Sequence, residues 1–159
     1  MTTVRQGGAF ESGVTATGFW LGITLGRVIL GFVTPKIGER LAVIIYLAAA
    51  IVLQLIFWLV PNFVVSAVVV AIQGFFMGPL FPAAIVAAAK LLPKKLHVSS
   101  IGISSAVGGA GAALLPFATG AIANSKGVST LQPIILAFLV CQLGFWLLLP
   151  KFPRNTHDE

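Results

Sequence analysis

Residues 63–89 read FVVSAVVVAIQGFFMGPLFPAAIVAAA and contain no charged side chain. An α-helix rises about 1.5 Å per residue, so about twenty apolar residues cross a hydrocarbon core about 30 Å thick. Four other stretches of the chain share this apolar character, and only short connectors separate them. The sequence therefore predicts an all-α, polytopic membrane protein with five transmembrane helices. The predicted helices comprise residues 14–33, 41–60, 63–89, 98–123 and 131–150.

The composition favours a membrane protein over a soluble one. Of the 159 residues, 58% are hydrophobic and 9% are charged, whereas about a quarter of the residues in a soluble domain are charged. The net charge of +6 could also indicate nucleic-acid binding. However, the basic residues are spread over short loops and form no stripe with interleaved aromatic residues. We therefore expect the lipid bilayer as a partner and no nucleic acid.

The basic residues of the connectors predict an orientation in the membrane. The connectors after the first and third predicted helices contain two and three lysines or arginines, and residues 151–159 contain two. The connector after the second helix contains none, and the one after the fourth contains only Lys126. By the positive-inside rule, the basic side is cytoplasmic. We expect residues 1–13 to be external and residues 151–159 to be a cytoplasmic tail, in the plasma membrane rather than in an organelle.

The predicted helices lack the residues that membrane enzymes need. Intramembrane proteolysis or acyl transfer requires paired aspartates, a serine with a histidine, or a metal cluster. The five helices contain no aspartate or glutamate, and His97 and His157 lie in a loop and in the tail. A lone cysteine, Cys141, supports neither a disulfide nor a zinc site. We therefore expect no enzyme activity, no catalytic residue, no metal and no cofactor.

The most specific string in the chain is GRVILGFVTPKIGER, residues 26–40. Pro35 is expected to end the first helix, and Gly38 to allow a tight turn. Arg27 lies inside the predicted helix and has two interpretations. It is either an anchor whose side chain reaches the interface, or one member of a buried pair with a carboxylate or a helix C-terminus.

This string resembles the loop signature of the major facilitator superfamily, Gly-x-x-x-Asp-Arg/Lys-x-Gly-x-Arg/Lys. Pro35 stands where the signature has its acidic residue, and such a replacement is common in the copy found in the second half of the family's members. The resemblance implies a cytoplasmic gate and loop motif. Its residues in this chain are Gly26, Arg27, Gly31, Lys36, Gly38 and Arg40.

The resemblance also implies a place for the five helices in a larger architecture. They correspond to helices eight to twelve of a twelve-helix transporter, which is one six-helix half without its first helix. The segment around Pro79 and Pro82 and the pattern GGxGxAxxP at residues 108–116 look similar to fucose-permease-like, sugar-type members. In this family the substrate lies between two pseudo-symmetric halves near the middle of the membrane.

Small residues and prolines distinguish the first, third and fourth predicted helices. Glycines recur every fourth residue at Gly18, Gly22 and Gly26 and predict a face on which a second helix backbone packs closely. Proline removes a backbone donor and kinks a helix. We expect helix breaks or kinks at Pro79, Pro82 and Pro116.

The candidates for a substrate cavity lie on these same three helices and are Trp20, Thr24, Gln73, Phe76 and Ser104. Gln73 has a second interpretation, in which it bonds to a neighbouring helix beside a purely structural kink. The second and fifth predicted helices are more uniformly aliphatic and are expected to be lipid-facing supports. Their isolated polar or aromatic sites are Tyr46, Gln54, Gln132 and Gln142.

The sequence supports two hypotheses for the function. In the first, the chain is the C-terminal fragment of a secondary transporter for a small solute. It is inactive alone, because one incomplete half provides no two-sided pathway, and it requires a partner that carries the N-terminal half. In the second, the chain is a non-transporting membrane subunit that pairs with a transporter half or a relative. Solute flux from the purified chain alone would exclude the second hypothesis.

Overall fold

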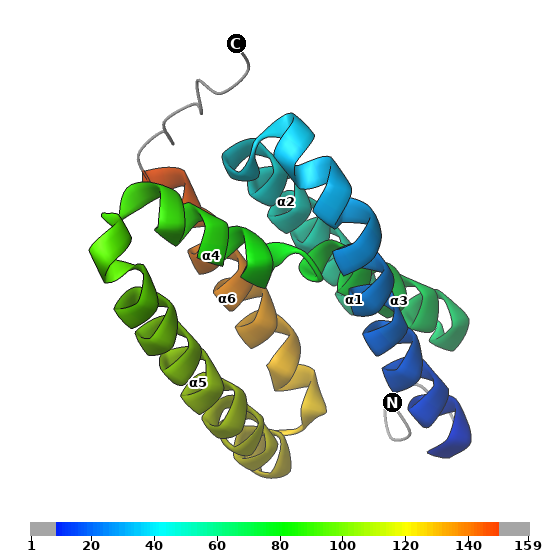
Figure 1. The fold of residues 1–159 in the computed structure, drawn as a ribbon. Helices are drawn as coiled ribbons and strands as arrows, with labels where there is room; N and C mark the ends of the chain where they lie inside the picture. The colour runs from blue at the N-terminus through cyan, green and yellow to red at the C-terminus, as the bar shows by residue number, and fades with distance from the viewer. Residues whose placement is uncertain (1–8, 150–159) are drawn as a thin grey trace.

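The computed structural model describes residues 9–149, which fold into helices connected by short turns (Figure 1). No β-strand occurs in this part of the chain. The elements are α1 (Ala9–Ile37), α2 (Glu39–Leu59), α3 (Phe63–Met77), α4 (Leu80–Leu91), the 3₁₀ turn η1 (Lys94–Leu96), α5 (His97–Lys126), the 3₁₀ turn η2 (Val128–Thr130) and α6 (Leu131–Leu148).

Five helical segments of the described chain are long and apolar enough to cross a bilayer. The third of them consists of α3 and α4 together, with a break between them. The prediction of an all-α protein with five membrane-spanning helices is confirmed. The segments are Gly13–Ile37, Glu39–Leu59, Phe63–Leu91, Lys94–Lys126 and Leu131–Leu148.

The turn between α1 and α2 is made by a glycine, as predicted. Gly38 has a φ of 95°, a backbone conformation that side-chain-bearing residues rarely adopt. Its N–H donates to the carbonyl of Thr34 at 2.9 Å. The prediction that Pro35 ends the helix is wrong, because α1 continues through Pro35 to Ile37. The reversal of the chain at Gly38, and not the missing donor of Pro35, sets the end of this helix.

The core of the molecule is built around one face of α2. Five of its apolar side chains belong to the buried cluster, together with Leu30 of α1, Leu80 and Ala83 of α4, and Leu139 of α6. The α2 members are Ala42, Val43, Tyr46, Leu47 and Ala50. The prediction that this helix is a lipid-facing support is therefore wrong for its inner face. Only its outer face, with Val52 and Leu59, is exposed.

Polar contacts join three helices at the edge of the bundle where α2 begins. Lys90, near the end of α4, donates to both carboxylate oxygens of Glu39 at 2.8 Å. Arg40 donates from Nη2 to the carbonyl of Leu147 in the last turn of α6 at 3.1 Å. The indole Nε1 of Trp146 donates back to the carbonyl of Arg40 at 3.1 Å. The start of α2 is therefore bound to the ends of both α4 and α6.

Helix α5 is packed much less than the others. It has no buried residue, and it approaches α4 at its beginning and α6 near its end (Figure 1). Large apolar side chains such as Val107 and Phe117 are mostly exposed. A Cβ added at any of Gly102, Gly108, Gly109, Gly111 or Gly120 would meet no atom within 4 Å. The small residues of α5 therefore form a surface without a partner among the described residues.

Candidate functional site

The candidate site lies where α1 crosses the broken third segment, and glycines make this crossing close. A Cβ added at Gly22 or Gly26 of α1 would overlap the carbonyl oxygen of Ala71 or Phe75 of α3. The reverse contact is equally close, since a Cβ added at Gly74 would overlap the carbonyl oxygen of Phe19. The predicted close-packing face of α1 is confirmed. Its partner is α3 of the same chain.

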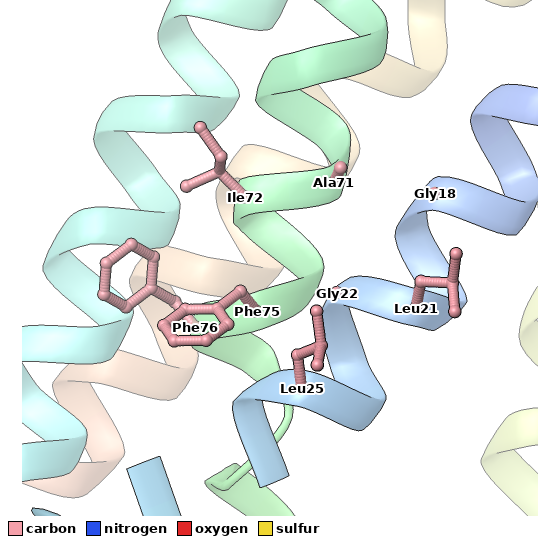
Figure 2. Close-up of a pocket in the computed structure, with 8 residues that line it drawn as sticks. All are labelled: Gly18, Leu21, Gly22, Leu25, Ala71, Ile72, Phe75 and Phe76. Carbon is pink, nitrogen blue, oxygen red and sulfur yellow. The ribbon is translucent and has the colours of Figure 1, made fainter. Parts of the chain in front are cut away.

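An apolar groove of about 510 Å³ opens beside this crossing (Figure 2). Phe75 and Phe76 form its floor at the α3 end, and Leu21 and Leu25 form the opposite wall on α1. Its lining residues are Gly18, Leu21, Gly22, Leu25, Ala71, Ile72, Phe75 and Phe76. None of these side chains carries a hydrogen-bonding group, so the groove by itself accommodates an apolar side chain or lipid tail better than a polar solute.

The structure separates the candidate residues for a substrate cavity. Phe76 lines the groove, whereas Trp20 and Thr24 are exposed on α1 and Ser104 is exposed on α5. The hydroxyl of Thr24 donates to the carbonyl of Trp20 at 3.0 Å, within its own helix. The side chains of these exposed residues are therefore accessible to any molecule that contacts the surfaces of α1 and α5.

Gln73 lies in a chain of amide side chains inside the bundle. Its Nε2 donates to Oε1 of Gln54 at 3.1 Å, and Nε2 of Gln54 donates to Oε1 of Gln132 at 2.8 Å. Gln54 and Gln73 are both buried. The second interpretation of Gln73, a bond to a neighbouring helix, is the one observed. The sequence shows the three glutamines, but it does not show that their side chains bond to one another across α3, α2 and α6.

Arg27 bonds to the backbone at the break between α3 and α4. Its Nε donates to the carbonyl oxygen of Gly78 at 3.3 Å, and Gly78 is the residue that caps the end of α3. Arg27 is itself an exposed residue, so the structure shows the contact with a helix C-terminus but not the burial that the second interpretation assumes, and the anchor interpretation stays a prediction.

The break itself lies at Gly78 and Pro79, between the end of α3 and the start of α4. Pro82 lies in the first turn of α4, where a helix tolerates proline. Pro116 lies inside α5, which continues on both sides of it as one helix. Among the three expected positions, Pro79 is the one at which a helix is interrupted.

The other residues of the loop motif do not gather at one site. Gly31 and Lys36 are exposed on α1, and Gly31 has no atom close to where a Cβ would lie. Gly38 forms the turn, and Arg40 contacts the end of α6. Within the described part of the chain, the structure also brings together no three histidine, cysteine, aspartate or glutamate side chains that could hold a metal ion.

Comparison with known proteins agrees with this arrangement of helices. Residues 3–159 match the Major Facilitator Superfamily. The chain belongs to this superfamily. It is also 37% identical over 155 residues to the protein called Bypass of stop codon protein 6 from Saccharomyces cerevisiae. The alignment covers 91% of this chain and 31% of the yeast protein, so the chain spans about a third of the length of that relative. No solved structure matches the chain.

Proposed function

We propose that this chain is the C-terminal part of a secondary transporter and moves a small solute only together with the part that it lacks. Its five spans then serve as helices eight to twelve of the family architecture. Family membership and the unpacked surface of α5 support this proposal. Helix α5 has no buried residue. We expect such a helix to pack against a further helix in the membrane, because close packing of small residues is the main attraction between helices in lipid.

The exposed faces of α1 and α5 supply the solute-contacting residues in this proposal. Trp20, Thr24 and Ser104 then contact the solute in the completed transporter, and Phe76 contributes to the apolar groove beside α1. Gln73 has a structural role instead, because its amide is buried and bonded to Gln54. Exposed aromatic rings and hydroxyl groups suit a sugar-type solute, which is the class that the fucose-permease-like segments indicate.

The proposed transporter lies in the plasma membrane, with the N-terminal end of this chain outside and its C-terminal end in the cytoplasm. The gate motif then lies at the cytoplasmic edge. Lys36 is exposed there and is available to the other half, whereas Arg40 is already engaged with α6.

Reconstitution into liposomes tests the proposal. The chain is purified alone, or after co-expression with the part of the yeast relative that lies outside the matched segment. Uptake of radiolabelled L-fucose and D-glucose is then measured for both preparations. We expect no uptake by the chain alone and uptake by the co-expressed pair. Uptake by the chain alone would overturn the proposed need for a partner.

A variant that is expected to change transport but not assembly distinguishes the two effects. Exposed Thr24 on α1 is replaced by valine, which preserves the shape of the side chain and removes its hydroxyl. We expect this variant to assemble with the other part as the unmodified chain does, and to transport less. Stable assembly of the unmodified pair without uptake of either sugar would favour the alternative function, a non-transporting interaction subunit.

A further inference from the structure

The two prolines of the third segment leave two backbone carbonyls without their usual donors, and one of these is the carbonyl of Gly78. In a continuous helix, the N–H of residue 82 donates to the carbonyl of residue 78. Residue 82 is a proline and has no N–H. Gly78 is buried inside the bundle, and in the membrane an unsatisfied carbonyl costs several kcal/mol. The carbonyl of Gly78 therefore needs a donor from elsewhere.

Arg27 is placed to supply this donor. Its Nε lies 3.3 Å from the carbonyl oxygen of Gly78. The backbone of α1 passes directly over Gly78, since a Cβ added there would lie 2.9 Å from the backbone nitrogen of Arg27. This closeness explains why the bond uses Nε, the guanidinium nitrogen nearest the main chain. A longer distance between the helices would place the outer nitrogens at the carbonyl instead.

The charges around Arg27 agree with this assignment. Glu39 is the only acidic residue in residues 13–149, and its carboxylate is bound by Lys90 at 2.8 Å. Arg27 thus has no carboxylate to pair with in this part of the chain. The carbonyl of Gly78 lies at the end of α3, two residues before α4 begins at Leu80.

We propose that Arg27 replaces the missing N–H of Pro82 and thereby fixes the angle between α3 and α4. Arg27 is a positioning residue that ties α1 to the break. A change in the angle at Gly78 and Pro79 must either break the hydrogen bond from Arg27 or move α1 along with the carbonyl. In this proposal α1 and the two halves of the third segment therefore move as a coupled unit. This inference concerns the fold of the chain and does not depend on the proposed transport.

A cycle of four variants tests the coupling: the unmodified chain, Arg27→Met, Pro82→Ala and the double variant. Alanine at position 82 restores the N–H, so the carbonyl of Gly78 regains a donor within its own helix. We expect Arg27→Met to lower the unfolding midpoint of the purified chain in detergent by at least about 3 °C. In the Pro82→Ala background, the same change should lower it by less than half as much. An equal loss in both backgrounds would overturn the proposal.

Pro116→Ala is the matched control, because Pro116 also lies inside a helix but has no arginine contact. Combined with Arg27→Met, it should leave the loss of midpoint unchanged. Arg27→Lys tests whether a donor near the main chain is needed or a positive charge alone is enough, because lysine keeps the charge but has its donor at the end of the side chain. We expect lysine to restore little of the midpoint, and full recovery with lysine would overturn the proposal. If Arg27→Met does not fold, recovery of folded protein only with Pro82→Ala supports the coupling, and failure of both variants overturns it.

The angle between α3 and α4 provides a second measurement that a general loss of stability does not change. Spin labels are attached at Val64→Cys and Leu91→Cys, which are exposed positions near the two ends of the segment. Cys141 is replaced by serine in this background. We expect Arg27→Met to broaden the distance distribution between the labels when residue 82 is proline, but not when it is alanine. An unchanged distribution in the proline background would contradict the proposal.

Discussion

Glycine 26 illustrates how a single missing side chain determines a contact between helices. The carbonyl of Phe75 occupies the space that a Cβ on Gly26 would need. Pro79 lacks the N–H that would bond this carbonyl in a continuous helix. The glycine therefore allows α1 to cover a carbonyl that the break exposes, and weak contacts from its Cα hydrogens can contribute there.

We expect Gly26→Ala to destabilise the purified chain by about 1–3 kcal/mol, because the helices must separate to admit the methyl group. Gly31→Ala is the control on the same helix, where a Cβ meets no neighbour. It should leave stability unchanged or raise it by up to about 1 kcal/mol, since alanine favours a helix more than glycine does. The measurement is the thermal unfolding midpoint in detergent. Equal effects of the two substitutions would contradict the packing described for α1 and α3.

Gln54 occupies the middle of the amide chain, and its loss removes two bonds. In Gln54→Leu, the amides of Gln73 and Gln132 both lose a partner. Interhelical hydrogen bonds in membranes contribute about 0.6 kcal/mol each on average, so we expect a destabilisation of about 1 kcal/mol or more. Gln142→Leu, at an exposed position of α6, should have no measurable effect. A stable Gln54→Leu protein would show that the amide chain contributes nothing to the fold.

At the scale of the helices, the burial of α2 and α5 is the reverse of what their sequences suggest. The aliphatic α2 is central, because its small residues Ala42 and Ala50 admit neighbours on one face. The glycine-rich α5 could pack more closely than α2, yet it buries nothing. A run of small residues thus permits close packing but does not provide the partner.

We expect Gly109→Leu on α5 to leave the stability of the isolated chain within about 0.5 kcal/mol of the unmodified value. The added side chain points into open space, since no atom lies near a Cβ at this position. The same substitution should weaken co-purification with the part that completes the transporter, because that part packs on α5 in the proposed assembly. Gly22→Leu, which would collide with α3, should instead prevent folding of the isolated chain. Loss of folding in Gly109→Leu would contradict the exposure of α5.

For the whole molecule, the polar contacts concentrate at one edge of the bundle. Glu39, Lys90 and Arg40 bind the start of α2 to the ends of α4 and α6. The opposite edge has the uncharged connector between α2 and α3, where Asn62 caps α3 by accepting from the N–H of Val64 at 3.0 Å. The predicted orientation rests on the basic residues of the connectors, which are more numerous at the first of these edges.

We expect membrane-impermeant maleimide to label Ser125→Cys but not Lys36→Cys on intact cells, in a Cys141→Ser background. Both positions are exposed, and they lie at opposite ends of the bundle. Permeabilised cells, in which both variants should be labelled, provide the control. Labelling of Lys36→Cys from outside would reverse the orientation that the positive-inside rule predicts.

The sequence by itself determined the number of spans and the family motif, and it limited the helix break to three prolines, of which the structure interrupts a helix at Pro79. These features are local, because insertion of a segment into lipid depends on its own hydrophobicity and a proline removes a hydrogen bond from its own helix. Only the tertiary structure decided that Gly22 and Gly26 pack on α3, that Gln73 joins Gln54, and that Arg27 reaches Gly78. Lipid is as apolar as the helix faces, so hydrophobicity does not select a partner. The choice depends on close fit and hydrogen bonds between residues far apart in the chain.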